Sequence, residues 1–334
     1  MVEKVLKNPE AALMSKLFED YLSWSLQLKR ALESEVLDAK FIDVRALRGI
    51  SFLGMGGSGI IGDVLTKLLS KTLDIPVVTI KDYTLPKFIG KDWLVVALSY
   101  SGETLETIMS FSEAVKRGAI TCVVASGGRL MAMAEKVKSP RIVVEGGHTP
   151  RSAFPALLAG TINLINSLLN LDLRIESGVE VLEDRVAIEI AEDLAKFLFT
   201  GVPVFVVTDD LYPLGLRAKN EFNENSKIVG KVEVLPEWGH NDIVGWEGGN
   251  REWFKFVLFK EGPGLIDFAS DYLRELGYNL KVLNVSKPSY LETMLYGSWI
   301  VGLSSVILAK LRGLDPEETK SIKRYKEFLK SYFK

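Results

Sequence analysis

Cysteine and histidine are both scarce in this chain of 334 residues. The single cysteine, Cys122, excludes a disulfide within the chain, and this favours a reducing compartment, the cytoplasm. The two histidines and one cysteine are too few to form a cluster with metal-ligand spacing. We therefore expect no metal site in this protein.

An excess of charge of either sign is also absent. Lys and Arg number 41 and Asp and Glu number 43, so the formal net charge is −2 at pH 7. Nucleic-acid-binding proteins carry basic patches, so we expect no nucleic-acid partner. The longest apolar tracts, 155–171 and 296–311, contain asparagines or serines and fall short of the roughly 20 apolar residues of a membrane span. The first ten residues, "MVEKVLKNPE", lack the apolar core of a signal peptide, and we expect no membrane association.

The chain is too long for one ordinary core and fits two domains of roughly 150 residues. Apolar residues at helical spacing predict one or two helices over 9–38. Short runs rich in Val and Ile then alternate with amphipathic helices, a pattern typical of parallel sheets covered on both faces. We expect an α/β protein with two doubly wound parallel sheets: an N-terminal helical arm over 1–48, a first domain over 49–172, and a second domain with C-terminal helices over 173–334.

A glycine-rich turn, "GMGGSG", follows the first predicted strand. Gly54, Gly56 and Gly59 fit G-x-G-x-x-G, a spacing that directs backbone N–H groups at a phosphate on a helix N-terminus. The motif alone does not identify the ligand. An NAD site also needs an acidic residue after the second strand, and Asp82 meets that requirement. From these residues alone, an NAD-dependent oxidoreductase stays open.

A cluster of hydroxyl groups, in "ALSYSGETLET", follows the third predicted strand. Ser99, Ser101 and Thr104 surround a strand-to-helix turn, where hydroxyls and free N–H groups suit a small phosphate dianion. A hydride-transfer enzyme has no evident need for this cluster. The alternative is that Ser101 or Thr104 only caps the helix, with help from Glu103 or Glu106.

Several motifs in order along the chain resemble a known family. "GMGGSG" and "SYSGET" resemble the sugar isomerase (SIS) domain that binds phosphosugars. "NENSK" (223–227), "PEWGHND" (236–242) and "LDPEETKSIKRYK" (314–326) resemble the bifunctional phosphoglucose/phosphomannose isomerases of archaea and some bacteria. The resemblance extends from about residue 50 to the C-terminus. It implies two SIS domains of flavodoxin-like fold that interconvert glucose 6-phosphate, mannose 6-phosphate and fructose 6-phosphate.

Aldose–ketose isomerisation moves a proton between C1 and C2 through a cis-enediol. The reaction needs a base, a group that opens the sugar ring, positive charge near the enediolate and a phosphate anchor. Glu224 matches the family base by resemblance, whereas Glu221, three residues earlier, is expected to be structural. His240 matches the ring-opening residue, which in this family comes from the other subunit and implies a homodimer.

The resemblance assigns further residues. Arg151 matches the arginine that stabilises the negative intermediate, and Lys326 matches a lysine implicated in ring opening. Thr319 occupies a position where a small side chain leaves room for rotation about C2–C3, which implies use of mannose 6-phosphate. Six residues are implied to bind substrate, mostly near its phosphate: Gly57, Ser58, Ser99, Ser101, Thr104 and Thr319. His148 has no role in these motifs.

Other function classes use parts of this pattern. A non-catalytic SIS-type phosphosugar sensor would keep the three hydroxyls but has no use for Glu224 and His240 together. An aminosugar enzyme of the same class would bring a glutaminase domain or an amine-donor site, and the N-terminal region shows neither. On the sugar-phosphate interpretation, the G-x-G-x-x-G match is coincidental, and we expect no cofactor.

Overall fold

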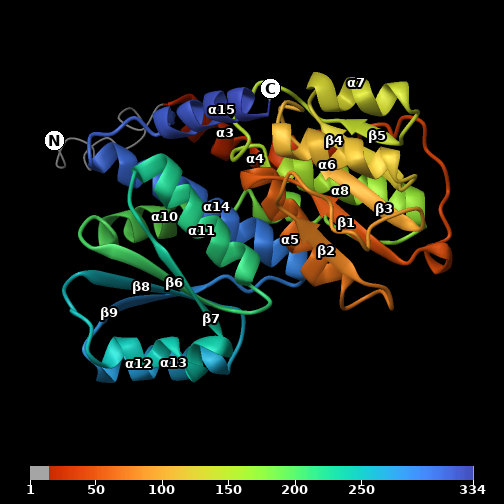
Figure 1. Cartoon of the computed structure of the whole chain (residues 1–334). Coiled ribbons are helices and arrows are strands. Elements are labelled where there is room, and N and C mark those ends of the chain that lie inside the picture. Colours follow the sequence, from red (N-terminus) through yellow and green to blue (C-terminus); the bar gives the residue numbers. More distant parts are fainter. Residues whose placement is uncertain (1–14, 334) are drawn as a thin grey trace. The chain divides into compact units, whose positions relative to one another are not determined.

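The computed structural model describes residues 15–333, which form two compact units (Figure 1). The first-sheet unit consists of Ser23–Val179 together with the described part of Lys320–Lys334. The second-sheet unit consists of Glu180–Thr319 and the described residues up to Leu22. Residues 9–14 of the predicted N-terminal helix lie outside the described residues.

The first-sheet unit is built on five parallel strands in the order β2-β1-β3-β4-β5. The strands are β1 (Gly49–Leu53), β2 (Val77–Ile80), β3 (Trp93–Leu98), β4 (Ile120–Ala125) and β5 (Arg141–Val143). β1 and β3 are buried along their whole length, as their unbroken apolar sequences predict. The strand order reverses between β1 and β3, and ligands of open α/β sheets bind at the carboxyl ends of the strands at such a point.

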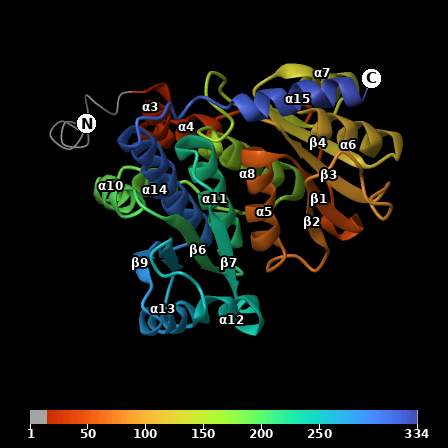
Figure 2. The same ribbon diagram turned by 60° about the vertical axis from the view of Figure 1, so that its left-hand side comes forward.

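Helices cover both faces of this sheet (Figures 1 and 2). They are α4 (Trp24–Leu32), α5 (Gly56–Leu69), α6 (Leu105–Lys116), α7 (Gly128–Lys136), α8 (Phe154–Leu169) and α15 (Lys320–Tyr332), with a 3₁₀ turn at Val44–Ala46. Alternate residues of β3 and β4, such as Val95 and Val123, pack against the apolar sides of α6 and α7. α5 packs against α8 and β1 on the other face.

The second-sheet unit has four parallel strands in the order β7-β6-β8-β9. The strands are β6 (Val202–Thr208), β7 (Lys231–Leu235), β8 (Phe254–Lys260) and β9 (Asn279–Asn284). The helices are α3 (Lys16–Leu22), α10 (Val186–Phe197), α11 (Tyr212–Ser226), α12 (Asp242–Glu247), α13 (Leu265–Glu275) and α14 (Tyr290–Leu311), with a 3₁₀ turn at Glu237–His240; a short α9 (Gly178–Val181) spans the division between the units. Figure 1 shows α10, α11 and α14 on one face of this sheet and α12 and α13 on the other.

Helix α14 is the central helix of the second-sheet unit and packs against α10, α11 and α3. By length and composition alone it could span a membrane, and it is the one such helix among residues 15–333. However, 94% of its most apolar stretch is buried inside the protein. A helix that is apolar all round is expected at the centre of a large fold, so its composition is explained by packing.

The predicted fold class, α/β with two doubly wound parallel sheets, is confirmed. Helices α3 and α4 correspond to the described part of the predicted arm. Contacts group the chain differently from the predicted boundaries in three respects. The predicted arm is divided between the units after Leu22, and the division between the two sheets falls after Val179 rather than after residue 172. In addition, α15 joins the first sheet rather than the second. Its attachment there is apolar: Leu329 is buried, and the Phe333 ring packs edge-on against Tyr83 with centroids 4.9 Å apart.

Candidate active site

Two loops meet at the point where the strand order of the first sheet reverses. One leads from β1 into the first turn of α5, which contains Ser58, and the other follows β3 and contains Ser99 and Thr104. The backbone N–H of Tyr100 donates to Ser58 Oγ at 3.2 Å, which joins the loops. Ser99 Oγ donates to Thr104 Oγ1 at 3.0 Å. The first-sheet unit therefore brings three of the predicted substrate-binding hydroxyls together, beside the N-termini of α5 and α6.

The glycines of the first loop have a packing role. Gly56 has φ +52°, a conformation that side chains disfavour. A Cβ on Gly59 would lie 2.7 Å from the carbonyl oxygen of Gly54, so the turn could not close on itself with a larger residue. The glycine spacing is thus explained by the tight strand-to-helix turn, whatever anion binds there.

The alternative that Ser101 or Thr104 only caps helix α6 explains the loop after β3 only in part. Thr104 occupies the N-cap position of α6, but its side chain makes no capping hydrogen bond. Ser101 Oγ accepts from the Glu103 N–H at 3.2 Å and so stabilises its own turn. Asp82 is also used locally, because its carboxylate accepts the N–H groups of Tyr83 and Thr84 at 2.6 and 3.2 Å. One oxygen of the Asp82 carboxylate therefore stabilises the turn that follows β2.

Arg151 lies between β5 and α8 and is 7% exposed. Its backbone closely approaches the first loop: a Cβ on Gly57 would lie 3.3 Å from Arg151 Cα and 3.0 Å from the Pro150 carbonyl oxygen. A side chain at 57 would press against this backbone and require it to move by a few tenths of an ångström. The structure therefore places Arg151 directly beside the first turn of α5, which carries Gly57 and Ser58.

Tyr100 connects the loop after β3 to the segment that carries Arg151. Its hydroxyl donates to the Glu145 carbonyl oxygen and accepts from the His148 N–H, both at 2.9 Å. Sequence reasoning missed this residue, although its position between Ser99 and Ser101 was a signal. Tyr100 fixes the loop after β3 and the segment after β5 relative to one another.

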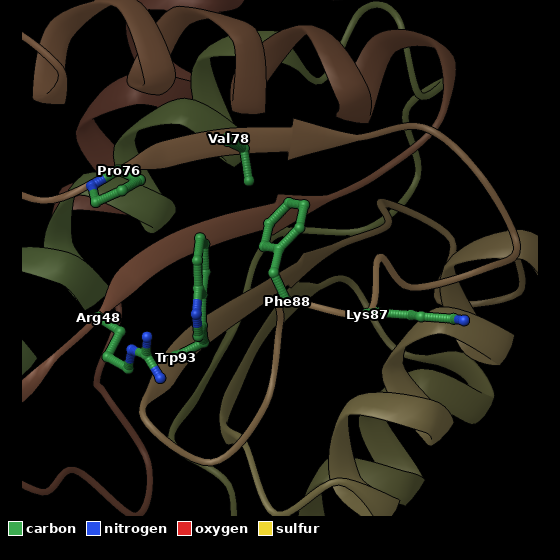
Figure 3. A pocket seen from close by; sticks show the side chains of 6 residues that line it. All are labelled: Arg48, Pro76, Val78, Lys87, Phe88 and Trp93. Atoms are coloured by element: carbon green, nitrogen blue, oxygen red, sulfur yellow. The ribbon is translucent and has the colours of Figure 1, made fainter.

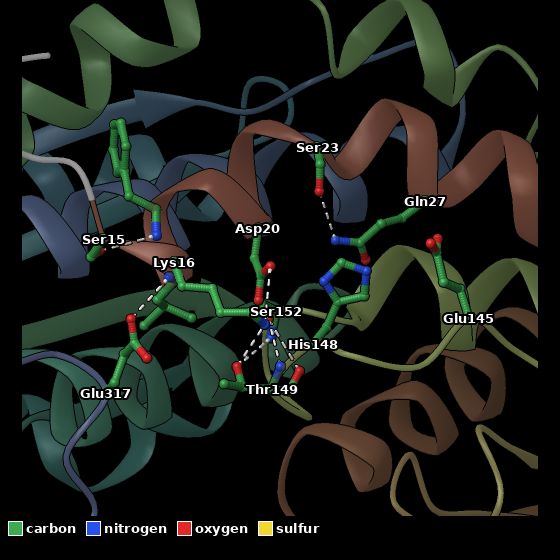
Figure 4. A network of polar contacts seen from close by, with 12 residues as sticks. Ser15, Lys16, Asp20, Ser23, Gln27, Glu145, His148, Thr149, Ser152 and Glu317 are labelled. Carbon is green, nitrogen blue, oxygen red and sulfur yellow. Dashed lines mark hydrogen bonds and ion pairs between the residues drawn. The ribbon is translucent and has the colours of Figure 1, made fainter.

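The segment that carries Arg151 is also braced from within. Figure 4 shows Thr149 and Ser152 joined by several polar contacts, with their hydroxyl oxygens 2.9 Å apart. The Trp24 indole N–H donates to the Ser152 carbonyl oxygen at 2.8 Å, and the Trp24 ring stacks on Phe154 with centroids 5.8 Å apart. Arg151 is therefore held in a preorganised backbone.

A cavity of about 610 Å³ lies where α15 passes the loop after β3. Its lining residues are Ser101, Glu103, Leu105, Arg129, Lys326, Lys330 and Phe333. The structure thus brings the predicted residues Ser101 and Lys326 to one cavity. Sequence reasoning missed Lys330, which follows Lys326 by four residues and so shares its helix face.

This cavity carries uncompensated positive charge. Arg129 forms an ion pair with Glu103, with Nε 2.7 Å from Oε2. Partial burial opposes ionisation of Glu103, but hydrogen bonds from Arg129 outweigh it and hold its pKa below the usual value, with help from the nearby Lys330 charge. Within residues 15–333, the ammonium groups of Lys326 and Lys330 have no hydrogen-bond or ion-pair partner. Two positive charges are therefore available to an anion.

The remaining predicted residues belong to the second-sheet unit. Half-buried Glu224 lies in the last turn of α11, which ends at Ser226. Lys227 Nζ donates to the Glu224 carbonyl oxygen at 2.9 Å and to the Asp315 carbonyl oxygen at 2.6 Å. This link ties the end of α11 to the segment that leads to half-buried Thr319.

Glu224 and His240 are not brought together within this unit. α11 starts beyond the carboxyl end of β6 and returns, so Glu224 lies near the amino ends of the strands. His240 is exposed and follows the carboxyl end of β7. The five residues of β7 separate these edges by roughly 16 Å at about 3.3 Å per residue. One copy of this unit therefore presents the two side chains at opposite edges of its sheet.

Comparison with known proteins agrees with this architecture. A profile for the SIS domain matches residues 46–134, and one for the bacterial phospho-glucose isomerase C-terminal SIS domain matches residues 187–329. A bifunctional phosphoglucose/phosphomannose isomerase of Aquifex aeolicus is 32% identical over 87% of this chain and 93% of that relative. The chain belongs to this family. The predicted isomerase class and SIS domains are confirmed.

The family also contains different chemistry. A relative in Sulfolobus acidocaldarius, 30% identical over 85% of this chain and 90% of its own, is a D-glucosamine-6-phosphate 4-epimerase. Among solved structures, a hypothetical protein of Thermus thermophilus superposes with a TM-score of 0.74 at 14% identity, over 99% of this chain and 96% of that one. That likeness concerns the fold alone.

Proposed function

We propose that this isomerase interconverts glucose 6-phosphate, mannose 6-phosphate and fructose 6-phosphate through a cis-enediol. The observation that carries the proposal is the hydroxyl cluster of Ser58, Ser99 and Thr104 at the strand-order reversal, with Arg151 fixed beside it. Hydroxyls and helix N-termini suit a phosphate dianion, and a held phosphate limits where the reacting carbons can lie. The name carried by the Aquifex relative supports these substrates.

Each step of the reaction has a candidate residue. Glu224 removes the proton from C2 of the aldose and returns it to C1, and the hydroxyl proton moves between O1 and O2. Arg151 stabilises the negative charge that develops on the enediolate oxygens, and its guanidinium remains charged in any environment. Lys326 and His240 assist ring opening. Thr319 leaves space for rotation about C2–C3, so both epimers present their proton to the base.

Turnover of fructose 6-phosphate tests the proposal directly. The purified protein is incubated with fructose 6-phosphate and a chelator, without nucleotide, and the products are resolved by NMR. Both aldose phosphates are expected, and Glu224→Gln should lower kcat by about a hundredfold or more. Formation of glucose 6-phosphate alone would refute the role of Thr319. Binding without turnover would favour the non-catalytic phosphosugar sensor.

The epimerase relative supplies a second candidate, epimerisation of glucosamine 6-phosphate at C4. The same NMR experiment with glucosamine 6-phosphate distinguishes it, because the C4 epimer and a ketose have different spectra. If glucosamine 6-phosphate is converted and fructose 6-phosphate is not, epimerisation at C4 replaces isomerisation as the function of this protein.

A homodimer in which His240 acts at the partner's site is also part of the proposal, as is a cytoplasmic location. The separation of Glu224 from His240 across one sheet supports the homodimer, because a second copy of the chain could supply the missing side chain. Inactive Glu224→Gln and His240→Ala chains, unfolded together and refolded at equal amounts, should regain about a quarter of wild-type activity, since half the dimers have one intact site. No regain would place both residues in one subunit.

A further inference from the structure

A second cavity, of about 600 Å³, lies at the amino edge of the first sheet (Figure 3). Arg48 immediately precedes β1, Pro76 precedes β2, and Trp93 begins β3, while Lys87 and Phe88 come from the connection between β2 and β3. The candidate active site lies at the opposite, carboxyl edge. The five residues of β1 separate the two edges by roughly 16 Å, so this cavity has no part in the reaction proposed above.

The aromatic wall of this cavity is fixed in place. A Cβ on Gly49 would lie 2.6 Å from the Trp93 ring, so the indole rests directly on the backbone of β1. Trp93 is 6% exposed, and the Phe88 ring leans on it with centroids 5.3 Å apart and planes at 50°. Phe88 itself is 60% exposed, so most of its ring is available to another molecule.

The loop that holds Phe88 outward is anchored rather than loose. The Arg117 guanidinium donates to three of its carbonyl oxygens, those of Leu85, Pro86 and Ile89, at 3.0, 2.7 and 3.1 Å. The side chains of Leu85 and Ile89 are buried on either side. Exposure of the phenyl ring is therefore built into the fold, and the surface is preorganised for a ligand.

Positive charge flanks the aromatic rings. Figure 3 shows the Arg48 guanidinium beside Trp93, and Lys87 extends on the other side of Phe88. Within residues 15–333, neither side chain has a hydrogen-bond or ion-pair partner, and the lining residues include no acidic group. A ligand suited to this surface has a flat aromatic part and a negative group.

We propose that this cavity binds a nucleotide, with the base stacked on Phe88 and a phosphate held by Arg48. Aromatic side chains stack on any base, and a guanidinium binds phosphate through paired N–H groups. A cavity of this volume is within the range of small-ligand sites. Lys87 lies farther from the rings and adds long-range attraction to the phosphate.

Isothermal titration calorimetry with adenosine 5′-monophosphate and with adenosine tests the assignment. Phe88→Ala should weaken binding of both by about tenfold, the loss expected of one stacked base. Arg48→Gln should weaken the nucleotide by about five- to tenfold and leave adenosine unchanged. Phe41→Ala and Arg45→Gln are matched controls, since Phe41 is exposed elsewhere and Arg45 is paired with Asp43. Both controls should bind as the wild type does.

The titrations are repeated with saturating fructose 6-phosphate to distinguish this cavity from the phosphate-binding loops. Nucleotide binding that persists and depends on Phe88 supports the proposal. No binding at millimolar nucleotide, or binding that fructose 6-phosphate removes and Phe88→Ala leaves intact, would overturn it. Since Phe88 and Arg48 are exposed, neither substitution should impair folding.

Discussion

The Tyr21 hydroxyl donates a hydrogen bond to the Glu221 carboxylate, 200 positions later in the chain. The other Glu221 oxygen pairs with Arg217 at 2.6 Å, and both of these side chains are 2% exposed. Asn225 Nδ2 donates to Glu221 at 2.9 Å and to Ser305 Oγ at 2.9 Å. This buried network joins α3, α11 and α14, and so positions the helix that carries Glu224.

Loss of the Glu221 charge should therefore affect stability first. Glu221→Gln leaves the buried Arg217 charge without its carboxylate, and breaking a buried pair from one side costs about 3 kcal/mol or more of unfolding free energy. Glu224→Gln, one helical turn away and half-buried, should change that free energy by less than about 1 kcal/mol. Urea denaturation of both variants measures the contrast. Equal stability of the two variants would contradict a structural role for Glu221.

Tyr100 should act as a positioning residue for Arg151. Tyr100→Phe removes the hydrogen bonds to Glu145 and His148 and so loosens the segment before Arg151. We expect kcat to fall by about tenfold, because misplacement of the charged group raises the barrier, while KM stays nearly constant. Tyr83→Phe is the control, since the Tyr83 hydroxyl makes no hydrogen bond within residues 15–333. An unchanged kcat in Tyr100→Phe would exclude this role.

Lys330 should contribute to binding of the substrate's phosphate. Lys330→Gln removes one of the two free charges in the cavity beside Ser101, so KM for fructose 6-phosphate should rise about fivefold at unchanged kcat. The dependence of KM on ionic strength should weaken as well. Arg324→Gln removes a charge from another face of α15 and should leave both constants unaltered. Equal effects of the two substitutions would indicate that Lys330 acts on the substrate only through the overall positive electrostatic potential.

Glu233 should make stability depend on pH. Burial raises its pKa above the usual 4.5, although Lys231 and the Trp246 indole bind the carboxylate. The folded protein then holds this proton more tightly than the unfolded chain, so the stability that this group contributes is greatest below pH 4.5 and falls as pH rises through the raised pKa. The unfolding free energy of the wild type minus that of Glu233→Gln should therefore decrease as the pH rises from 4.5 through the raised pKa of Glu233. Urea titrations at about pH 4, 5, 6 and 7 measure the difference, and parallel curves would refute the shift.

Local sequence predicted the elements well, because strand and helix periodicity report which faces are buried. The apolar runs of β1 and β3 and the turn after each were correctly expected, and with them the cluster of hydroxyls. Helix α11 continues through the polar sequence around Glu224 to Ser226, where Lys227, in a left-handed conformation, closes it. Propensity alone does not include that cap.

Contacts between residues that are far apart in the chain could not be predicted from sequence patterns. Lys330 lies beyond the matched C-terminal profile, which ends at 329, and only the return of α15 to the first sheet brings it beside Ser101. In the sequence, Tyr100 resembles an ordinary aromatic residue of the core, and only the structure reveals the two backbone groups that its hydroxyl contacts. The cavity near Phe88 depends on Arg117, whose three carbonyl acceptors are distributed over a loop about 30 positions earlier.

Patterns in the amino-acid sequence were sufficient to identify the class of this protein, because periodic burial and two loop motifs depend on residues close together in the chain. They indicated two parallel sheets, the loops after β1 and β3 and the family to which the chain belongs. The tertiary structure alone decided which side chains meet: Tyr21 with Glu221, Gly57 with Arg151, and Lys330 with Ser101. Such contacts are fixed by chain reversal and packing over tens to hundreds of residues, and no local pattern encodes them.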